Sequence, residues 1–62
     1  MKIYNYNVEF VLEAMVIITN VSFDEPDLSD EFIIEEARQH LVRYYKIDPE
    51  VLYLQDVNVF EV

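Results

Sequence analysis

Residues 4–23 read YNYNVEFVLEAMVIITNVSF, and up to residue 13 they largely alternate between apolar and polar side chains. A period of two residues is typical of a β-strand that buries one face and exposes the other. The side chains that we expect on the buried face share even positions: Tyr4, Tyr6, Val8, Phe10, Leu12, Ala14, Val16 and Ile18. Asn and Glu dominate the odd positions before residue 15, which we expect to face water.

Two chain paths fit this stretch, because the odd positions also become apolar from Met15 onward. This change indicates a strand buried on both faces or a bulge that exchanges them. One path is a single long, bent strand, and the other is a hairpin that turns near Leu12–Ala14. Average strand length favours the hairpin. The absence of Gly favours the single strand, because tight turns usually need Gly. We expect two strands, or a bent strand that behaves as two.

A helix is predicted next, from Asp27 or Ser29 to Tyr45. Asp27 and Ser29 are both suitable N-caps, and Pro26 fits a position in the first turn. The sequence KIDPE, residues 46–50, ends the helix because a residue before proline is pushed to extended geometry.

The helical repeat separates an apolar face from a polar one. The apolar face holds Ile33, Ile34, Ala37, Leu41, Tyr44 and Tyr45. The polar face holds Glu35, Glu36, Gln39, Arg43 and Lys46. Phe32 and Val42 fall off the apolar face, so we expect them to make a second contact.

Residues 51–62, VLYLQDVNVFEV, are rich in β-branched and aromatic side chains and predict a last strand, which Gln55 and Asp56 split at a bulge. The predicted fold is α+β. Residues 1–62 form a single small β(β)αβ domain, with one helix packed on a short antiparallel sheet. Such a sheet leaves open edges that invite pairing with a second copy, so we expect a homodimer.

The residue inventory argues against catalysis and against a cofactor. Cys is absent and His40 is the single histidine, which excludes disulfides, thiolate metal sites and a His-based zinc site. Ser29 is better used as a cap. Glu36 and His40 have the spacing of a surface i,i+4 pair, and Glu35 and Arg38 form a second local pair. Neighbouring carboxylates on a helix point about 100° apart and do not converge on one point. We therefore expect a non-enzymatic protein without metal or cofactor.

The net charge is −9 in 62 residues. Direct binding to nucleic acid or to an anionic membrane favours Lys and Arg, so this charge argues against both partners. The most apolar run, AMVIITNV, is too short to span a bilayer. A chain without Cys fits the reducing cytoplasm, where we expect this protein.

Most of the excess charge lies in residues 24–36, which hold seven carboxylates and no Lys or Arg. Acidic residues in a first helical turn stabilise the helix dipole, which explains part of this segment. Asp24 and Glu25 are left over, and Phe32 is an apolar side chain among the acids. We predict a surface that mimics nucleic-acid charge and binds a basic protein surface. Its residues are Asp24, Glu25, Asp27, Asp30, Glu31, Phe32, Glu35 and Glu36.

Size, acidity and frequent Asn, Ile, Tyr and Glu resemble small phage and mobile-element proteins, several of which inhibit restriction or CRISPR nucleases. The resemblance is compositional, so it transfers no functional residues. It implies an inhibitor of anti-CRISPR or anti-restriction type that blocks a nuclease or another nucleic-acid-binding protein. Two alternatives remain: a structural homo-oligomer whose charge serves only solubility, and a subunit that pairs through a sheet edge.

Overall fold

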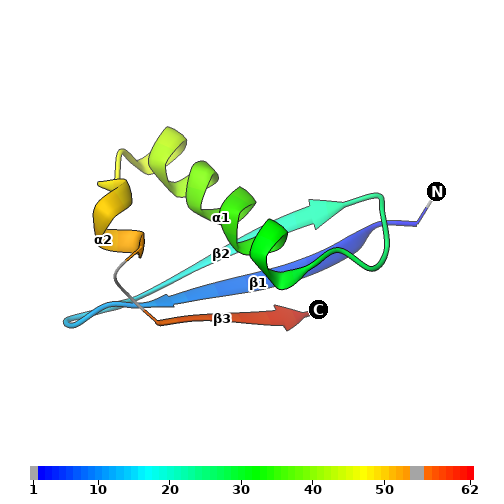
Figure 1. Ribbon diagram of the computed structural model, residues 1–62, viewed down its shortest axis with the longest axis horizontal. Helices are drawn as coiled ribbons and strands as arrows, with labels where there is room; N and C mark the ends of the chain where they lie inside the picture. The colour runs from blue at the N-terminus through cyan, green and yellow to red at the C-terminus, as the bar shows by residue number, and fades with distance from the viewer. Residues whose placement is uncertain (1, 54–55) are drawn as a thin grey trace.

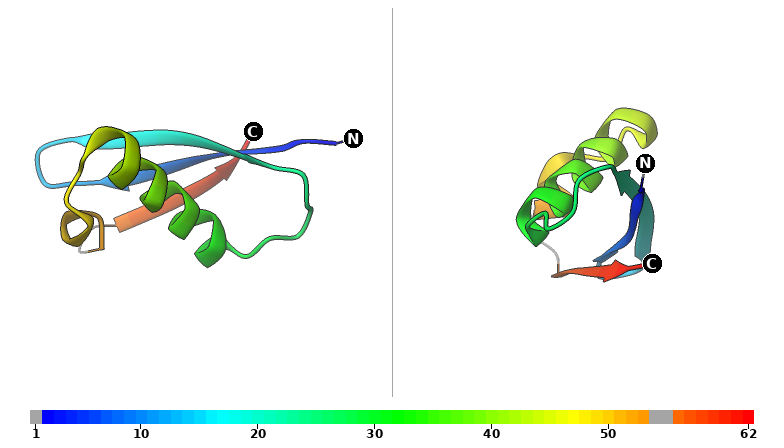
Figure 2. Two further views of the ribbon diagram at one scale, coloured as in Figure 1. Left: turned by 90° about the horizontal axis from the view of Figure 1, so that it is seen from above. Right: turned by 90° about the vertical axis from the view of Figure 1, so that its right-hand side faces the viewer.

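The computed structural model describes residues 2–53 and 56–62 and shows a three-stranded sheet with one main helix packed on it (Figure 1). Along the chain the elements are β1 (Tyr4–Val11), β2 (Val16–Phe23), α1 (Asp30–Tyr45), α2 (Pro49–Tyr53) and β3 (Asp56–Glu61). The strand order is β2-β1-β3, and β1 pairs antiparallel with both neighbours. Helix α1 runs over one face of the twisted sheet (Figure 2). The predicted α+β class and antiparallel sheet are confirmed.

Residues 4–23 form a hairpin, so the two-strand path is confirmed and the single bent strand is wrong. The turn is closed by a hydrogen bond of 2.8 Å from the Leu12 N–H to the Met15 carbonyl. Neither Glu13 nor Ala14, the two residues between them, has a positive φ. The chain therefore turns without the left-handed backbone that makes Gly necessary in many hairpins.

The hairpin also changes which positions face the core. Val8 pairs with Thr19, so even positions of β1 share a face with odd positions of β2. Val8 and Phe10 are fully buried, and Thr19 is buried beside them. The prediction that Ala14, Val16 and Ile18 continue the buried face is wrong, and Ile18 is 61% exposed. The odd positions become apolar after Met15 because the hairpin turn brings them to the core face, not because one strand is buried on both faces.

The opposite face of the sheet is polar near its middle, as the odd positions of β1 predict. Side chains bond across the strands there in three pairs: Ser22 to Asn5, Asn20 to Asn7, and Asn58 to Glu9. These bonds link both outer strands to β1 on the face that α1 does not cover.

Helix α1 begins at Asp30 with Ser29 as its N-cap. The Ser29 hydroxyl accepts a hydrogen bond of 3.2 Å from the Phe32 N–H. The alternative start at Asp27 is wrong, and Pro26 lies in the loop instead of the first turn. Asp27 has a φ of 61°, a left-handed conformation that Asp tolerates better than most residues. The predicted end is confirmed, because the helix stops at Tyr45 and Lys46 is left-handed.

The buried face of α1 is narrower than predicted. Ile33, Ala37 and Leu41 are buried and Ile34 is half-buried. Tyr44 and Tyr45 were expected to join them, but each is 66% exposed. The predicted second contacts of the off-face residues exist: Val42 packs against the core, and Phe32 contacts Phe23.

The C-terminal segment forms a strand only from Asp56 onward. Residues 51–53 were predicted to be extended but belong to the short helix α2, whose Leu52 is fully buried in the core. The predicted split at Gln55 lies outside the described residues. Pro49 starts this turn, and the Asp48 carboxylate accepts a hydrogen bond from the Glu50 N–H. In residues 2–53 and 56–62 no helix has the length and apolar character needed to cross a membrane.

The burial of Leu52 gives a test of α2. Leu52→Ala should lower the free energy of unfolding by about 2–5 kcal/mol, because it leaves a cavity in the core. The neighbouring Val51 is exposed, so Val51→Ala should change it by about 0.5 kcal/mol or less. Urea unfolding followed by circular dichroism measures both. Equal midpoints for the two variants would show that α2 does not close the core.

Candidate interaction surface

Five exposed acids gather where β2 passes into α1, at the end of the molecule opposite to the hairpin turn (Figure 1). We call this group the acidic end: Asp24, Glu25, Asp27, Asp30 and Glu31. The first three lie in the loop, and the last two lie in the first turn of α1. Three of the five acids therefore precede the helix and do not lie along it, because α1 starts three residues later than its earlier predicted start.

The structure brings Asp24, Glu25 and Phe32 together. With Phe23 and Leu28 they line a small hollow of about 110 Å³. The rings of Phe23 and Phe32 are 5.6 Å apart between centroids and tilted by 53°. Phe32 remains 45% exposed in spite of this contact. The hollow thus combines an apolar aromatic wall with two carboxylates.

Local sequence explains why the chain makes this hollow. Strand β2 ends at Phe23, and the left-handed Asp27 redirects the loop. Leu28 and Ile33 occupy the two positions of a hydrophobic staple, one before the cap and one in the fourth helical residue. Both contribute to the core or pack against it. The Ser29 cap then fixes Phe32, three residues later, near the end of β2.

The charges of the acidic end are not neutralised within the described chain. In residues 2–53 and 56–62 one ion pair forms, and it joins Arg38 to Glu35. Asp30 and Glu31 stabilise the positive end of the α1 dipole. Asp24, Glu25 and Asp27 precede the helix, so this effect does not explain them. Their carboxylates are available to a partner.

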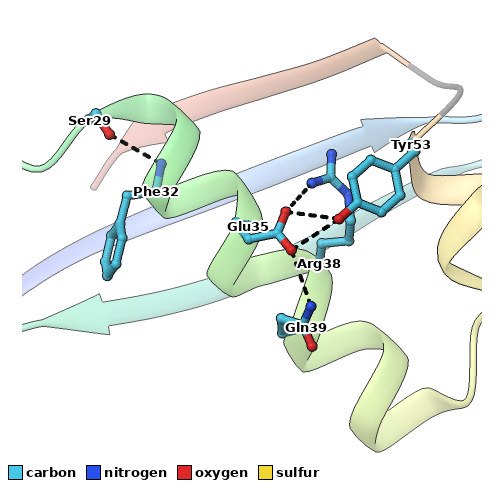
Figure 3. A network of polar contacts seen from close by, with 6 residues as sticks. All are labelled: Ser29, Phe32, Glu35, Arg38, Gln39 and Tyr53. Atoms are coloured by element: carbon cyan, nitrogen blue, oxygen red, sulfur yellow. Dashed lines mark hydrogen bonds and ion pairs between the residues drawn. The ribbon is translucent and has the colours of Figure 1, made fainter.

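Glu35 is part of an internal network and does not belong to the acidic end (Figure 3). Its carboxylate accepts hydrogen bonds from Arg38 at 2.6 Å, Gln39 at 3.1 Å and the Tyr53 hydroxyl at 3.1 Å. The Arg38 guanidinium also lies 3.8 Å from the centre of the Tyr53 ring. The predicted Glu35–Arg38 pair is confirmed, and its carboxylate is occupied by bonds that tie α1 to α2.

Glu36 lies beside a different part of the surface. It lines a groove of about 470 Å³ between α1 and β2, together with residues 20–23 and His40. The predicted pairing of Glu36 with His40 is not seen: within the described chain these residues form no ion pair. The His40 ring instead lies 4.8 Å from that of Tyr44. The eight predicted site residues therefore divide among the acidic end with its hollow, the Glu35 network and this groove.

Sequence reasoning missed the buried Arg38, which links Glu35 to Tyr53. The i,i+3 spacing of Glu35 and Arg38 signalled their pair. No local signal could place Tyr53 on Arg38, because residues 51–53 read as a strand.

Within residues 2–53 and 56–62, no group of three or more His, Cys, Asp or Glu is arranged to hold a metal ion. No protein-family model matches the chain, and searches of the curated proteins and of the solved structures give no match either.

The Glu35 network lowers the pKa of Glu35 below its ordinary value of 4.5. The largest cause is the hydrogen bond from Gln39, which partial burial opposes, and Tyr53 and Arg38 add to it. Because the folded pKa is the lower one, the stability that Glu35 contributes is complete above pH 4.5. It is lost as the pH falls through the folded pKa.

Gln39→Ala and Tyr53→Phe should each raise the pKa of Glu35 toward 4.5, because each removes a hydrogen bond to the charged form. An NMR titration of the Glu35 carboxyl carbon measures the midpoint. Tyr44→Phe is the matched control, since the exposed Tyr44 is not among the Glu35 partners. An unchanged midpoint in both test variants would rule out the network in solution.

Proposed function

We propose that this protein is a non-enzymatic inhibitor that binds a basic surface of a nucleic-acid-binding protein, such as a restriction or CRISPR nuclease. The observation that carries the proposal is the hollow of Asp24, Glu25 and Phe32, where an exposed aromatic ring and two carboxylates without an ion pair in the described chain line one space. Surfaces that combine charge with a central aromatic anchor are typical of protein interfaces. The acidity and small size support this reading.

A Lys or Arg side chain of the partner suits the hollow chemically. Its aliphatic stem can pack against Phe23 and Phe32, while its charged head meets Asp24 or Glu25. Arg can also stack on an aromatic ring, which adds a cation–π contribution. The hollow therefore offers one basic side chain both apolar contact and charge.

The acidic end imitates a short stretch of nucleic acid. Duplex DNA carries about one charge per 1.7 Å of its axis, so five carboxylates match the phosphates on roughly 9 Å of duplex. Five charges suit a single cluster of basic side chains, not a long nucleic-acid channel. We infer that the partner presents such a cluster and that nucleic acid competes for it.

A second candidate is a structural homo-oligomer, or a subunit that pairs through a sheet edge, with acidity that serves only solubility. The specific observation in its favour is the uncharged edge strand β2. In this case the acidic end would have no partner, and its charge could be changed without loss of any interaction.

Charge reversal distinguishes the two candidates. Asp24→Lys with Glu25→Lys should abolish partner capture from a nuclease-treated bacterial lysate, because the basic surface is then repelled. Added duplex DNA or high salt should release the partner from the unchanged protein, since both weaken electrostatic contacts. Mass spectrometry identifies the captured proteins.

The matched control is Glu13→Lys with Glu61→Lys, two exposed acids outside the acidic end. Each pair of substitutions changes the net charge by +4, from −9 to −5. The control should keep the partner. Equal capture by both double variants would contradict the proposed surface.

Phe32→Ala tests the apolar part of the hollow without a change of charge. It should weaken binding to the captured partner by about tenfold or more, as truncation of an aromatic interface anchor does. The loss should be about the same at a moderate salt concentration that weakens binding without releasing the partner, because contacts of an uncharged ring are not screened. Calorimetry measures it, with Tyr53→Phe as an aromatic control away from the hollow. Equal affinities of Phe32→Ala and the unchanged protein would remove Phe32 from the interface.

A further inference from the structure

Strand β2 is an edge strand without the features that usually protect an edge. It lies at one side of the sheet, and all eight of its residues pair with β1 in one continuous register, without a bulge. It contains no Lys, Pro or charged residue, although such residues are common on exposed edges. Residues 14–23 are also the longest uncharged run in a chain of net charge −9.

The free side of β2 presents backbone groups from four residues. Hydrogen-bonded and non-hydrogen-bonded pairs alternate in an antiparallel ladder. The bond from Leu12 to Met15 makes theirs a hydrogen-bonded pair, so the odd residues of β2 bond to β1. The N–H and C=O groups directed away from β1 then belong to Val16, Ile18, Asn20 and Ser22. Within the described chain, no backbone group outside the β1–β2 ladder bonds to these four residues.

The helix beside β2 carries exposed aromatic side chains. Tyr44 lines the groove that contains residues 20–23. Tyr45 lines a second groove of about 340 Å³ with Ile17 and Leu41. Both tyrosines lie on the same side of α1 as its buried residues, but they remain exposed because the sheet ends at β2. A further strand beside β2 would bring side chains to these grooves.

We propose that β2 pairs antiparallel with β2 of a second copy and joins two domains into a continuous six-stranded sheet. With Thr19 opposite Thr19 on the two-fold axis, Ile18 faces Asn20 and Val16 faces Ser22 of the partner copy. This register pairs all four outward-facing residues on each strand. Because the two-fold axis is perpendicular to the sheet, both α1 helices lie on one face.

Charge favours β2 over β3 as the edge at which a second copy pairs. Two chains of −9 repel each other, so a self-association surface must avoid acids. Strand β2 does so along its whole length. The other edge strand, β3, carries Asp56 and Glu61 at its ends, so two paired copies would place four carboxylates along the shared edge.

The dimer goes beyond the proposed inhibitor function and does not depend on it. Phe23, which precedes the acidic end, lies four residues from the two-fold axis at Thr19. At 3.4 Å per residue the two Phe23 positions are roughly 27 Å apart along the strands. Both hollows therefore stay open at opposite ends of the central strand pair.

Sedimentation equilibrium tests the proposal. The protein should show a mass of about 15 kDa, twice its 7.5 kDa, with a dissociation curve on dilution. Ile18→Pro should remain monomeric at concentrations where the unchanged protein is dimeric. Proline at this position removes an outward N–H and no bond to β1. Ile18→Thr keeps the N–H and should remain dimeric, as should Asp24→Lys with Glu25→Lys.

Hydrogen exchange provides a second measurement that needs no variant. The N–H groups of Ile18 and Asn20 should be protected at high concentration and exchange quickly in the dilute monomer. A mass of 7.5 kDa up to millimolar concentration would overturn the proposal. So would a dimer that leaves these two groups unprotected, or one that Ile18→Pro does not dissociate.

Discussion

The position of β1 between β2 and β3 is the constraint on which the rest of the structure depends. Its even side chains, Tyr6, Val8 and Phe10, form the floor of the core, and its backbone bonds to both neighbours. Three strands make a narrow sheet, so only a narrow row of side chains on the sixteen-residue α1 is buried against it. The short α2 completes the core by burying Leu52.

Local patterns predicted the elements well, and long-range contacts explain the errors. The alternation in residues 4–12, the Ser29 cap and the stop at Tyr45 depend on neighbours in the sequence, and the structure confirms all three. Burial of Tyr44 depends on how many strands lie under α1, which the helical repeat cannot show. The extended prediction for residues 51–53 failed because burial of Leu52 overrode the β propensity of its neighbours.

The candidate site was predictable in composition but not in arrangement. The sequence identified Asp24, Glu25 and Phe32 as the residues that the helix start does not explain, and the structure places them around one hollow. The sequence did not reveal that Tyr53 also bonds to Glu35 and stacks on Arg38, because these contacts need α2 in place. The number of acidic residues therefore overestimates the charge available to a partner wherever a carboxylate is bonded within the protein.

Separation of charge links the two proposals. The acids of residues 24–31 repel a second copy, while β2, directly before them, has no charge at all. A dimer through β2 keeps the acidic ends far from each other and on separate ends of the strand pair, so pairing adds little repulsion. Each hollow would then act as an independent site, and two basic clusters on one partner could be bound at once if their spacing matched. Such a bivalent contact gains affinity through effective concentration and needs no denser acidic surface.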